Sequence, residues 1–108
     1  MLAKKNRADT KIVEKVFKVG KFINSSILSF KFKLNSGSSL PRVSFIAPKN
    51  MAKKAVDRNT LRRLGYQALQ KQLSNLPAGL EGAFVFKKTP SSIEEIEHEI
   101  QTILTKIH

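Results

Sequence analysis

The segment SILSFKFKL, residues 26–34, alternates apolar and polar side chains along its length. Every second position from Leu28 to Leu34 is Leu or Phe, and the positions between them are Ser29, Lys31 and Lys33. Because successive side chains of a β-strand point to opposite faces of the sheet, this pattern predicts a strand with one face in a core and one polar face. The rest of the chain must therefore cover the apolar face, while the lysine face stays at least partly open.

Other segments have the periodicity of helices and strands. They predict a helix from Asp9 or Thr10 to Gly20, a strand over 42–47, a helix that begins near 53, a strand over 83–88 and a helix over 91–107, with one more short strand near 22–25. We expect the strands at 26–34 and 42–47 to form a hairpin. The predicted order is α-β-β-α-β-α, which indicates one α+β domain over residues 1–108: a two-layer α–β sandwich with a small, mostly antiparallel sheet.

The charge of the chain is +12, and it is concentrated in the first two thirds of the sequence. Residues 1–71 contain 17 Lys and Arg against 3 acids, whereas residues 72–108 contain 3 Lys against 5 Glu. A basic body of this kind favours a polyanionic partner, most often nucleic acid. A basic surface that only confers solubility is the alternative. An acidic membrane surface is less favoured, because no helix pairs a basic face with a bulky aromatic one.

Several classes of protein are disfavoured by what the sequence lacks. It has no cysteine, so neither disulfides nor thiolate metal sites are expected. It has no apolar run of the roughly 20 residues that span a bilayer, and its N-terminus does not resemble a secretory signal. We therefore expect a cytoplasmic protein without a membrane partner, a small-molecule substrate or a metal site of its own.

No catalytic residue is predicted. Capping and solvation account for four of the eight acids, which lie in the last helix: Glu94, Glu95, Glu97 and Glu99. His98 beside them is expected to be an exposed polar residue rather than a base. Asp57 suits the start of a helix better than a metal site.

The helix KKAVDRNTLRRLGYQAL, residues 53–69, carries the strongest binding signal. Arg58 and Arg62 are neighbours at i,i+4, where like charges repel by roughly 0.2–0.5 kcal/mol, which suggests an external anion. Arg binds phosphate through two donors at once, Asn59 can donate to phosphate or ribose, and Tyr66 can stack on a base. The predicted RNA-binding residues are Lys53, Lys54, Arg58, Asn59, Arg62, Arg63 and Tyr66; an ordinary solvated helix face is the alternative.

The lysine face of the sheet predicts a second binding surface. Basic groups beside an aromatic ring suit a single strand, whose phosphates are neutralised while a base stacks. The candidates are Lys15, Phe17, Lys31 and Lys33, although Phe17 also fits the apolar stripe of the first helix and would then be a core residue. A basic arm over residues 1–8 adds Lys4, Lys5 and Arg7.

The stretch KKAVDRNTLRRL resembles the protein subunit of bacterial ribonuclease P, whose basic loop and helix read roughly K-x-x-x-A-V-x-R-N-R-x-K-R-x-x-R. The resemblance extends to LAKKNR, EKVFKVGK, PRVSFIAPK and GAFVFKKTP, and so covers nearly the whole chain. The sequence departs from the family pattern at Thr60 and Tyr66, where arginine is usual. It also departs at Val13 and Lys31, where aromatics are common, and in a basic loop that is one residue longer.

The resemblance implies a left-handed β-α-β crossover around the arginine helix, which the right-handed rule for such units would not predict. It implies a catalytic RNA partner that, with Mg²⁺, removes the 5′ leader of precursor tRNA. The arginine helix would contact that RNA, and a cleft with Phe17, Lys31 and Lys33 would hold the leader. The alternatives are a small structural RNA-binding protein of the ribosomal kind and a general single-strand binder.

Overall fold

The computed structural model describes residues 7–34, 37, 40–49 and 53–107. Its elements are α1 (Thr10–Val19), β1 (Lys21–Asn24), β2 (Leu28–Lys33), β3 (Arg42–Ile46), α2 (Ala55–Gln70), the short 3-10 helix η2 (Leu73–Asn75), β4 (Glu81–Phe86) and α3 (Ile93–Thr105). The predicted α+β class and element order are confirmed, including the short additional strand, which is β1.

The strands form one mixed sheet in the order β1-β2-β4-β3. β1 pairs antiparallel with β2, β2 pairs antiparallel with β4, and β3 pairs parallel with β4. The predicted hairpin between β2 and β3 is therefore wrong: β4 lies between these strands, and the hairpin is β1–β2. A parallel pair needs a crossover, which α2 provides between β3 and β4.

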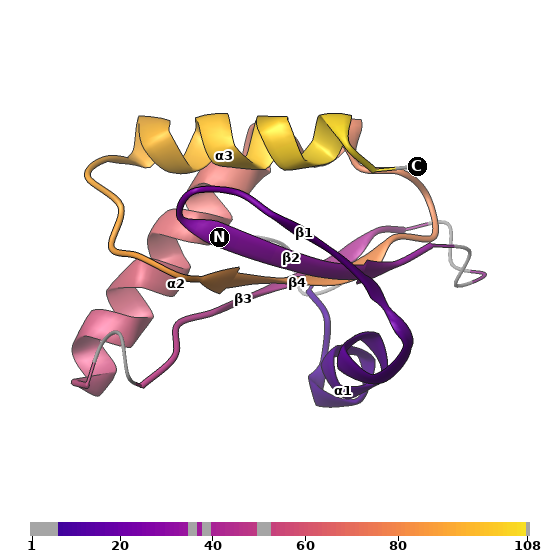
Figure 1. Cartoon of the computed structure of the whole chain (residues 1–108), viewed down its shortest axis with the longest axis horizontal. Coiled ribbons are helices and arrows are strands. Elements are labelled where there is room, and N and C mark those ends of the chain that lie inside the picture. Colours follow the sequence, from indigo (N-terminus) through magenta and orange to yellow (C-terminus); the bar gives the residue numbers. More distant parts are fainter. Residues whose placement is uncertain (1–6, 35–36, 38–39, 50–52, 108) are drawn as a thin grey trace.

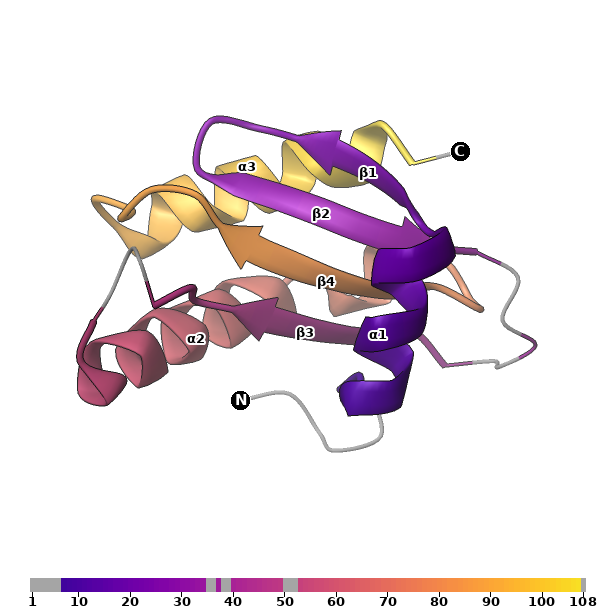
Figure 2. The same ribbon diagram turned by 60° about the horizontal axis from the view of Figure 1, so that its bottom comes forward.

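The crossover is left-handed. In Figure 2, β3 and β4 both run to the left, β4 lies above β3, and α2 connects them behind the sheet. A right-handed unit seen from this side would have β4 below β3.

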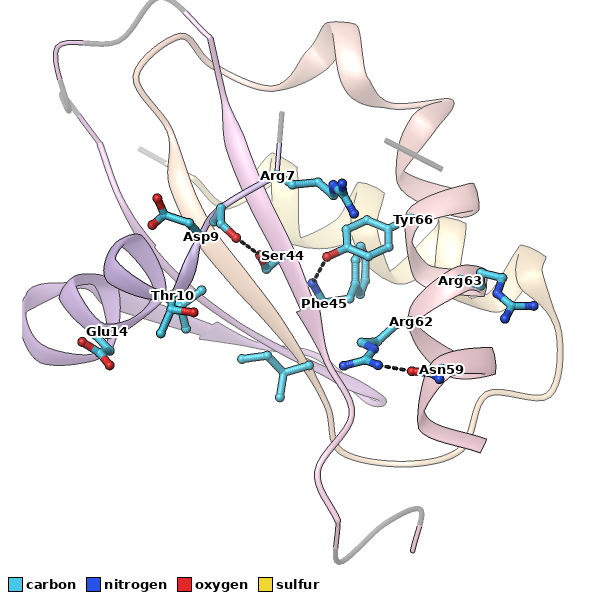
Figure 3. Close-up of a pocket in the computed structure, with 13 residues that line it drawn as sticks. Arg7, Asp9, Thr10, Glu14, Ser44, Phe45, Asn59, Arg62, Arg63 and Tyr66 are labelled. Carbon is cyan, nitrogen blue, oxygen red and sulfur yellow. Dashed lines mark hydrogen bonds between the residues drawn. The ribbon is translucent and has the colours of Figure 1, made fainter. Parts of the chain in front are cut away.

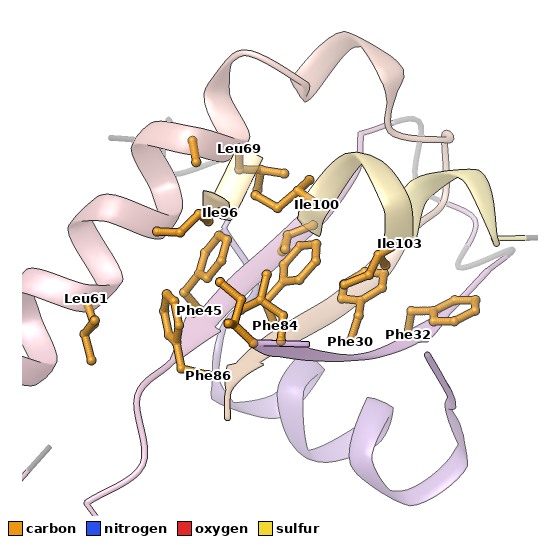
Figure 4. Close-up of a cluster of buried hydrophobic side chains, with 14 of the residues drawn as sticks. Phe30, Phe32, Phe45, Leu61, Leu69, Phe84, Phe86, Ile96, Ile100 and Ile103 are labelled. Carbon is orange, nitrogen blue, oxygen red and sulfur yellow. The ribbon is translucent and has the colours of Figure 1, made fainter. Parts of the chain in front are cut away.

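The helices lie on both faces of the sheet. α2 and α3 cover one face, and α1 crosses only one end of the other (Figures 1 and 2). The alternation of β2 is confirmed, because Leu28, Phe30 and Phe32 are buried while the residues between them are half-buried. Phenylalanine rings of β2, β3 and β4 fill the core against α2 and α3 (Figure 4). Phe30 and Phe45 stack on Phe84, and Phe86 is tilted against Phe45.

Local hydrogen bonds explain where two helices begin. Asp9 caps α1, where its carboxylate accepts from the Ile12 N–H at 2.9 Å. At the start of α3 the Ser92 hydroxyl accepts from the Glu95 N–H, and the Glu95 carboxylate accepts from the Ser91 N–H. The two bonds satisfy backbone donors at the start of α3 much as a capping box does, except that the carboxylate reaches Ser91 instead of the N-cap residue Ser92.

A glycine sets how closely α2 approaches the sheet. A Cβ on Gly65 would lie 2.5 Å from Cδ1 of Phe45 in β3. Glycine in mid-helix costs helix stability, and here it allows the helix backbone to rest on a core ring. Packing thus positions the arginines of α2 beside the edge of β3.

In the described parts of the chain, no helix is long and apolar enough to cross a membrane.

Candidate nucleic-acid interface

A cavity of about 460 Å³ lies between the start of α1, strand β3 and one side of α2 (Figure 3). We call it the basic pocket. Its walls include three arginines and two carboxylates, so its charge is positive. The lining residues are Arg7, Ala8, Asp9, Thr10, Val13, Glu14, Ser44, Phe45, Ile46, Asn59, Arg62, Arg63 and Tyr66.

The segment before α1 is attached to the outer edge of β3. The Ala8 N–H donates to the Val43 carbonyl at 3.2 Å, and the Ser44 hydroxyl donates to the Ala8 carbonyl at 2.7 Å. Arg7 forms a parallel bridge with Val43. These contacts hold Arg7 at the pocket, where Figure 3 shows its side chain near Tyr66.

The arginines of α2 and their asparagine form the opposite wall. The Arg62 guanidinium donates to the Asn59 side-chain carbonyl (Figure 3), which leaves the Asn59 amide NH₂ as a donor toward a ligand. Arg62 and Arg63 are both exposed. Arg58 donates to the Lys53 carbonyl at 2.9 Å and so closes the start of the helix instead of lining the pocket.

Tyr66 connects α2 to β3. Its ring lies edge-on to Phe45 with centroids 5.2 Å apart, and its hydroxyl oxygen accepts from the Phe45 N–H at 3.2 Å. The bond satisfies a backbone donor at the sheet edge. Because the oxygen is the acceptor in this bond, its own proton can be donated to a ligand in the pocket.

The second predicted surface is divided by α1. The Lys31 ammonium lies 4.7 Å from the centroid of the Phe17 ring, whereas Lys15 lies 4.0 Å from the buried Glu81 carboxylate. Glu81 is directly opposite Lys33 in the β2–β4 register. Side chains 15 and 17 project about 200° apart around a helix. α1 therefore crosses β2 between Lys31 and Lys33.

Lys15 and Lys33 form a like-charged pair. The nearby Lys15 ammonium, which would donate to Lys33 only when Lys33 is neutral and which repels its charged form, lowers the pKa of Lys33, and Glu81 offsets part of this effect. An anion beside these two lysines would remove that repulsion.

Phe17 is not a core residue. Its side chain is 44% exposed, so the alternative that placed it in the core is wrong. The buried residue of α1 is its neighbour Val16, which packs toward the sheet and leaves Phe17 at the side of the helix.

The structure brings some predicted residues together and separates others. Asn59, Arg62, Arg63, Tyr66 and Arg7 share the basic pocket. Lys53 and Lys54 are exposed before α2 and do not line the pocket, and Lys4 and Lys5 lie outside the described residues. Sequence reasoning missed the contributions of Thr10, Val13, Ser44 and Ile46, because only the β3–α1–α2 arrangement brings them to the arginines.

The carboxylates of the pocket have limited capacity for a metal ion. Asp9 is already occupied as the cap of α1, and Glu14 is one turn further along the same helix. No group of three or more possible ligands occurs in the described ranges. The side chains of the pocket suit an anion better than a divalent cation.

Known proteins resemble this chain in sequence family and in fold. The ribonuclease P family model matches residues 4–108. The ribonuclease P protein from Thermotoga maritima superposes with a TM-score of 0.78 at 19% identity, over 88% of this chain and 90% of that one. A mutant ribonuclease P protein from Staphylococcus aureus, described as defective in mRNA degradation activity, gives a TM-score of 0.81 at 15% identity, over 94% of this chain and 87% of that one. The search of curated proteins found no match.

The family match spans nearly the whole chain, and the left-handed crossover is the one that the resemblance implied. The chain belongs to the ribonuclease P protein family and is a protein subunit of that tRNA-processing enzyme.

Proposed function

We propose that this subunit binds the catalytic RNA of ribonuclease P through the basic pocket and the exposed side of α2. The observation that carries the proposal is the convergence of Arg7, Arg62, Arg63 and Asn59 on one cavity. Guanidinium groups bind phosphate oxygens in pairs, and the Asn59 amide adds a donor for phosphate or ribose. RNA phosphates would also neutralise the repulsion between the cations of α2.

The second part of the proposal concerns precursor tRNA. Its single-stranded 5′ leader would lie on the sheet face that α1 leaves uncovered, next to Phe17 and Lys31. This face has an accessible ring with an ammonium group beside it. A ring stacks with a base of any sequence, and an ammonium group neutralises the backbone. Lys15 and Lys33, on the other side of α1, would contact a different part of the RNA.

The bond cleavage is assigned to the RNA subunit. The protein residues described here bind and orient RNA, and none is assigned a proton transfer. Mg²⁺ is placed with the RNA, because the pocket of this chain combines arginines with a carboxylate that caps a helix. Since precursor tRNA is processed in the bacterial cytoplasm, we propose that compartment as the site of action.

The test is cleavage of a precursor tRNA by the ribonuclease P RNA of the same organism at limiting Mg²⁺, with and without this protein. We expect the protein to raise kcat/KM, and the gain to decrease when the leader is trimmed. Binding of the RNA without any change in cleavage would overturn the proposal and favour a purely structural RNA-binding role.

A further inference from the structure

Two phenylalanines stand apart from the other five. Phe30, Phe32, Phe45, Phe84 and Phe86 are buried in the core. Phe17 and Phe22 are 44% and 65% exposed. A single exposed apolar side chain is common on proteins, but two exposed rings beside one lysine form a specific arrangement.

The sheet register places Phe22 next to the Phe17–Lys31 contact. Phe22 of β1 lies directly opposite Lys31 of β2, so both side chains project from the same face. Directly opposite residues have Cβ atoms about 5 Å apart. The Lys31 ammonium in turn lies over the Phe17 ring. Lys31 is therefore flanked by one ring from α1 and one ring from β1.

The turn between α1 and β1 explains why the rings meet there. α1 ends at Val19 and β1 begins at Lys21, so Gly20 is the entire connection. A Cβ on Gly20 would overlap the carbonyl oxygen of Val16 and would lie 2.7 Å from the carbonyl oxygen of Phe32. This close approach presses the turn against β2, which brings residues on both sides of the turn to Lys31.

We propose that Phe22 is a second stacking residue for single-stranded RNA, which together with Phe17 and Lys31 forms a site for one or two unpaired nucleotides. The inference rests on the proposed leader-binding function and adds a residue to it. Both rings are accessible, and the lysine between them supplies the positive charge that a phosphate needs. No acidic residue lies on β1 or β2. Charge complementarity therefore favours a polyanion here over a second copy of this basic chain.

The experiment measures how tightly the holoenzyme binds two precursor tRNAs, one with a long leader and one with a leader trimmed to a single nucleotide. Phe22→Leu keeps an apolar side chain without a ring, and Phe22→Tyr keeps the ring. Val19→Ala is the matched control, because Val19 is also 65% exposed but lines a shallow hollow of α1 with Lys11, Lys15 and Lys18 instead of lying beside Lys31. Thermal unfolding of each variant verifies that the domain folds.

We expect Phe22→Leu to weaken binding of the long-leader precursor by about fivefold or more, as loss of one stacked base predicts. Phe22→Tyr and Val19→Ala should bind like the original protein, and all variants should bind the trimmed precursor equally well. The inference is overturned if Phe22→Leu binds the long leader normally, or if it weakens both precursors equally.

The outcomes separate this inference from the proposed function. If leader length affects binding and Phe17→Ala removes the effect but Phe22→Leu does not, the proposed function stands and Phe22 has no part in it. If leader length has no effect on the unmodified holoenzyme, both fail. Dissociation of a protein dimer by Phe22→Leu, with RNA binding unchanged, would assign the rings to a contact between copies instead.

Discussion

Glu99 is a buried carboxylate that joins α3 to the turn between β1 and β2. Its Oε1 accepts from the Ser25 hydroxyl at 2.6 Å and from the Ile27 N–H at 2.8 Å. Burial alone would raise the pKa of Glu99, but these hydrogen bonds, with a smaller contribution from His98, hold it below its usual value of 4.5. The expectation that all four glutamates of this helix are explained by capping and solvation is therefore wrong for Glu99.

Replacing Glu99 with Gln should reduce the free energy of unfolding by about 2 kcal/mol at neutral pH, since two charge-assisted hydrogen bonds become neutral ones. Because the pKa is lower in the folded state, this stabilisation is fully present above about 4.5 and is lost as the pH falls through the folded-state value. Urea unfolding at neutral and acidic pH measures the difference. Replacing the exposed Glu94 with Gln should cost less than about 1 kcal/mol. If the stability difference between Glu99→Gln and the original protein did not change with pH, the charge of Glu99 would not be the source of the stabilisation.

Tyr66 combines a structural contact with a place in the basic pocket. Tyr66→Phe keeps the ring contact with Phe45 but leaves the Phe45 N–H without the hydroxyl that accepts from it. We expect stability to fall by about 1 to 2 kcal/mol, the usual cost of an unpaired buried donor. Thermal or denaturant unfolding measures this loss. Unchanged stability would mean that water replaces the hydroxyl at this edge of β3.

At the scale of elements, the contact between α2 and β3 determines where the arginines lie. Gly65→Ala would improve helix propensity by about 1 kcal/mol, but its Cβ would come within 2.7 Å of Phe45 Cγ, which is held between Phe84 and Tyr66. Overpacking of a core costs about 1 to 3 kcal/mol, and Cγ cannot swing away as a flexible chain end can. Chemical denaturation should therefore show that Gly65→Ala is less stable than the original protein. The exposed Gln67→Ala should change the free energy of unfolding by no more than about 0.5 kcal/mol. If Gly65→Ala proves more stable than the original protein, β3 can move away from α2 to make room for the added methyl group.

The helices and strands differ in how well the sequence predicts them and their arrangement. Periodicity predicted the helices and the alternating strand, because each pattern is local. The position of β4 between β2 and β3 was not predictable from periodicity, since it depends on which strands pair across more than 35 residues. For the same reason, the arginine face of α2 could be predicted residue by residue. The pocket could not, because Ser44 and Thr10 have no local feature that marks a binding site.

At the scale of the whole molecule, the sheet separates the glutamates of α3 from α1 and from the lysine face of β2, although the arginine helix α2 lies on the same face as α3. The acidic helix α3 lies on the side opposite α1, and the salt bridge from Lys71 to Glu97, at 2.9 Å, joins the end of α2 to it (Figure 1). RNA on the uncovered sheet face therefore does not meet the glutamates of α3, and no residue of α3 lines the basic pocket. This separation orients the subunit on a polyanion, and displacement of cations from the RNA contributes to binding.

The charge separation predicts which arginines determine the salt dependence of RNA binding. Arg62→Ala combined with Arg63→Ala should weaken binding of the ribonuclease P RNA and lower the slope of log K against log salt by about 1 to 2, roughly one unit for each phosphate that the protein no longer neutralises. Both side chains are exposed, so the melting temperature should hardly change. Lys87→Ala with Lys88→Ala removes the same charge from exposed positions outside the pocket and should leave the slope nearly unchanged. If the two double variants lower the salt slope equally, overall charge rather than the basic pocket binds the RNA. If the arginine variant unfolds, Arg62 and Arg63 do not form an outward-facing surface of α2.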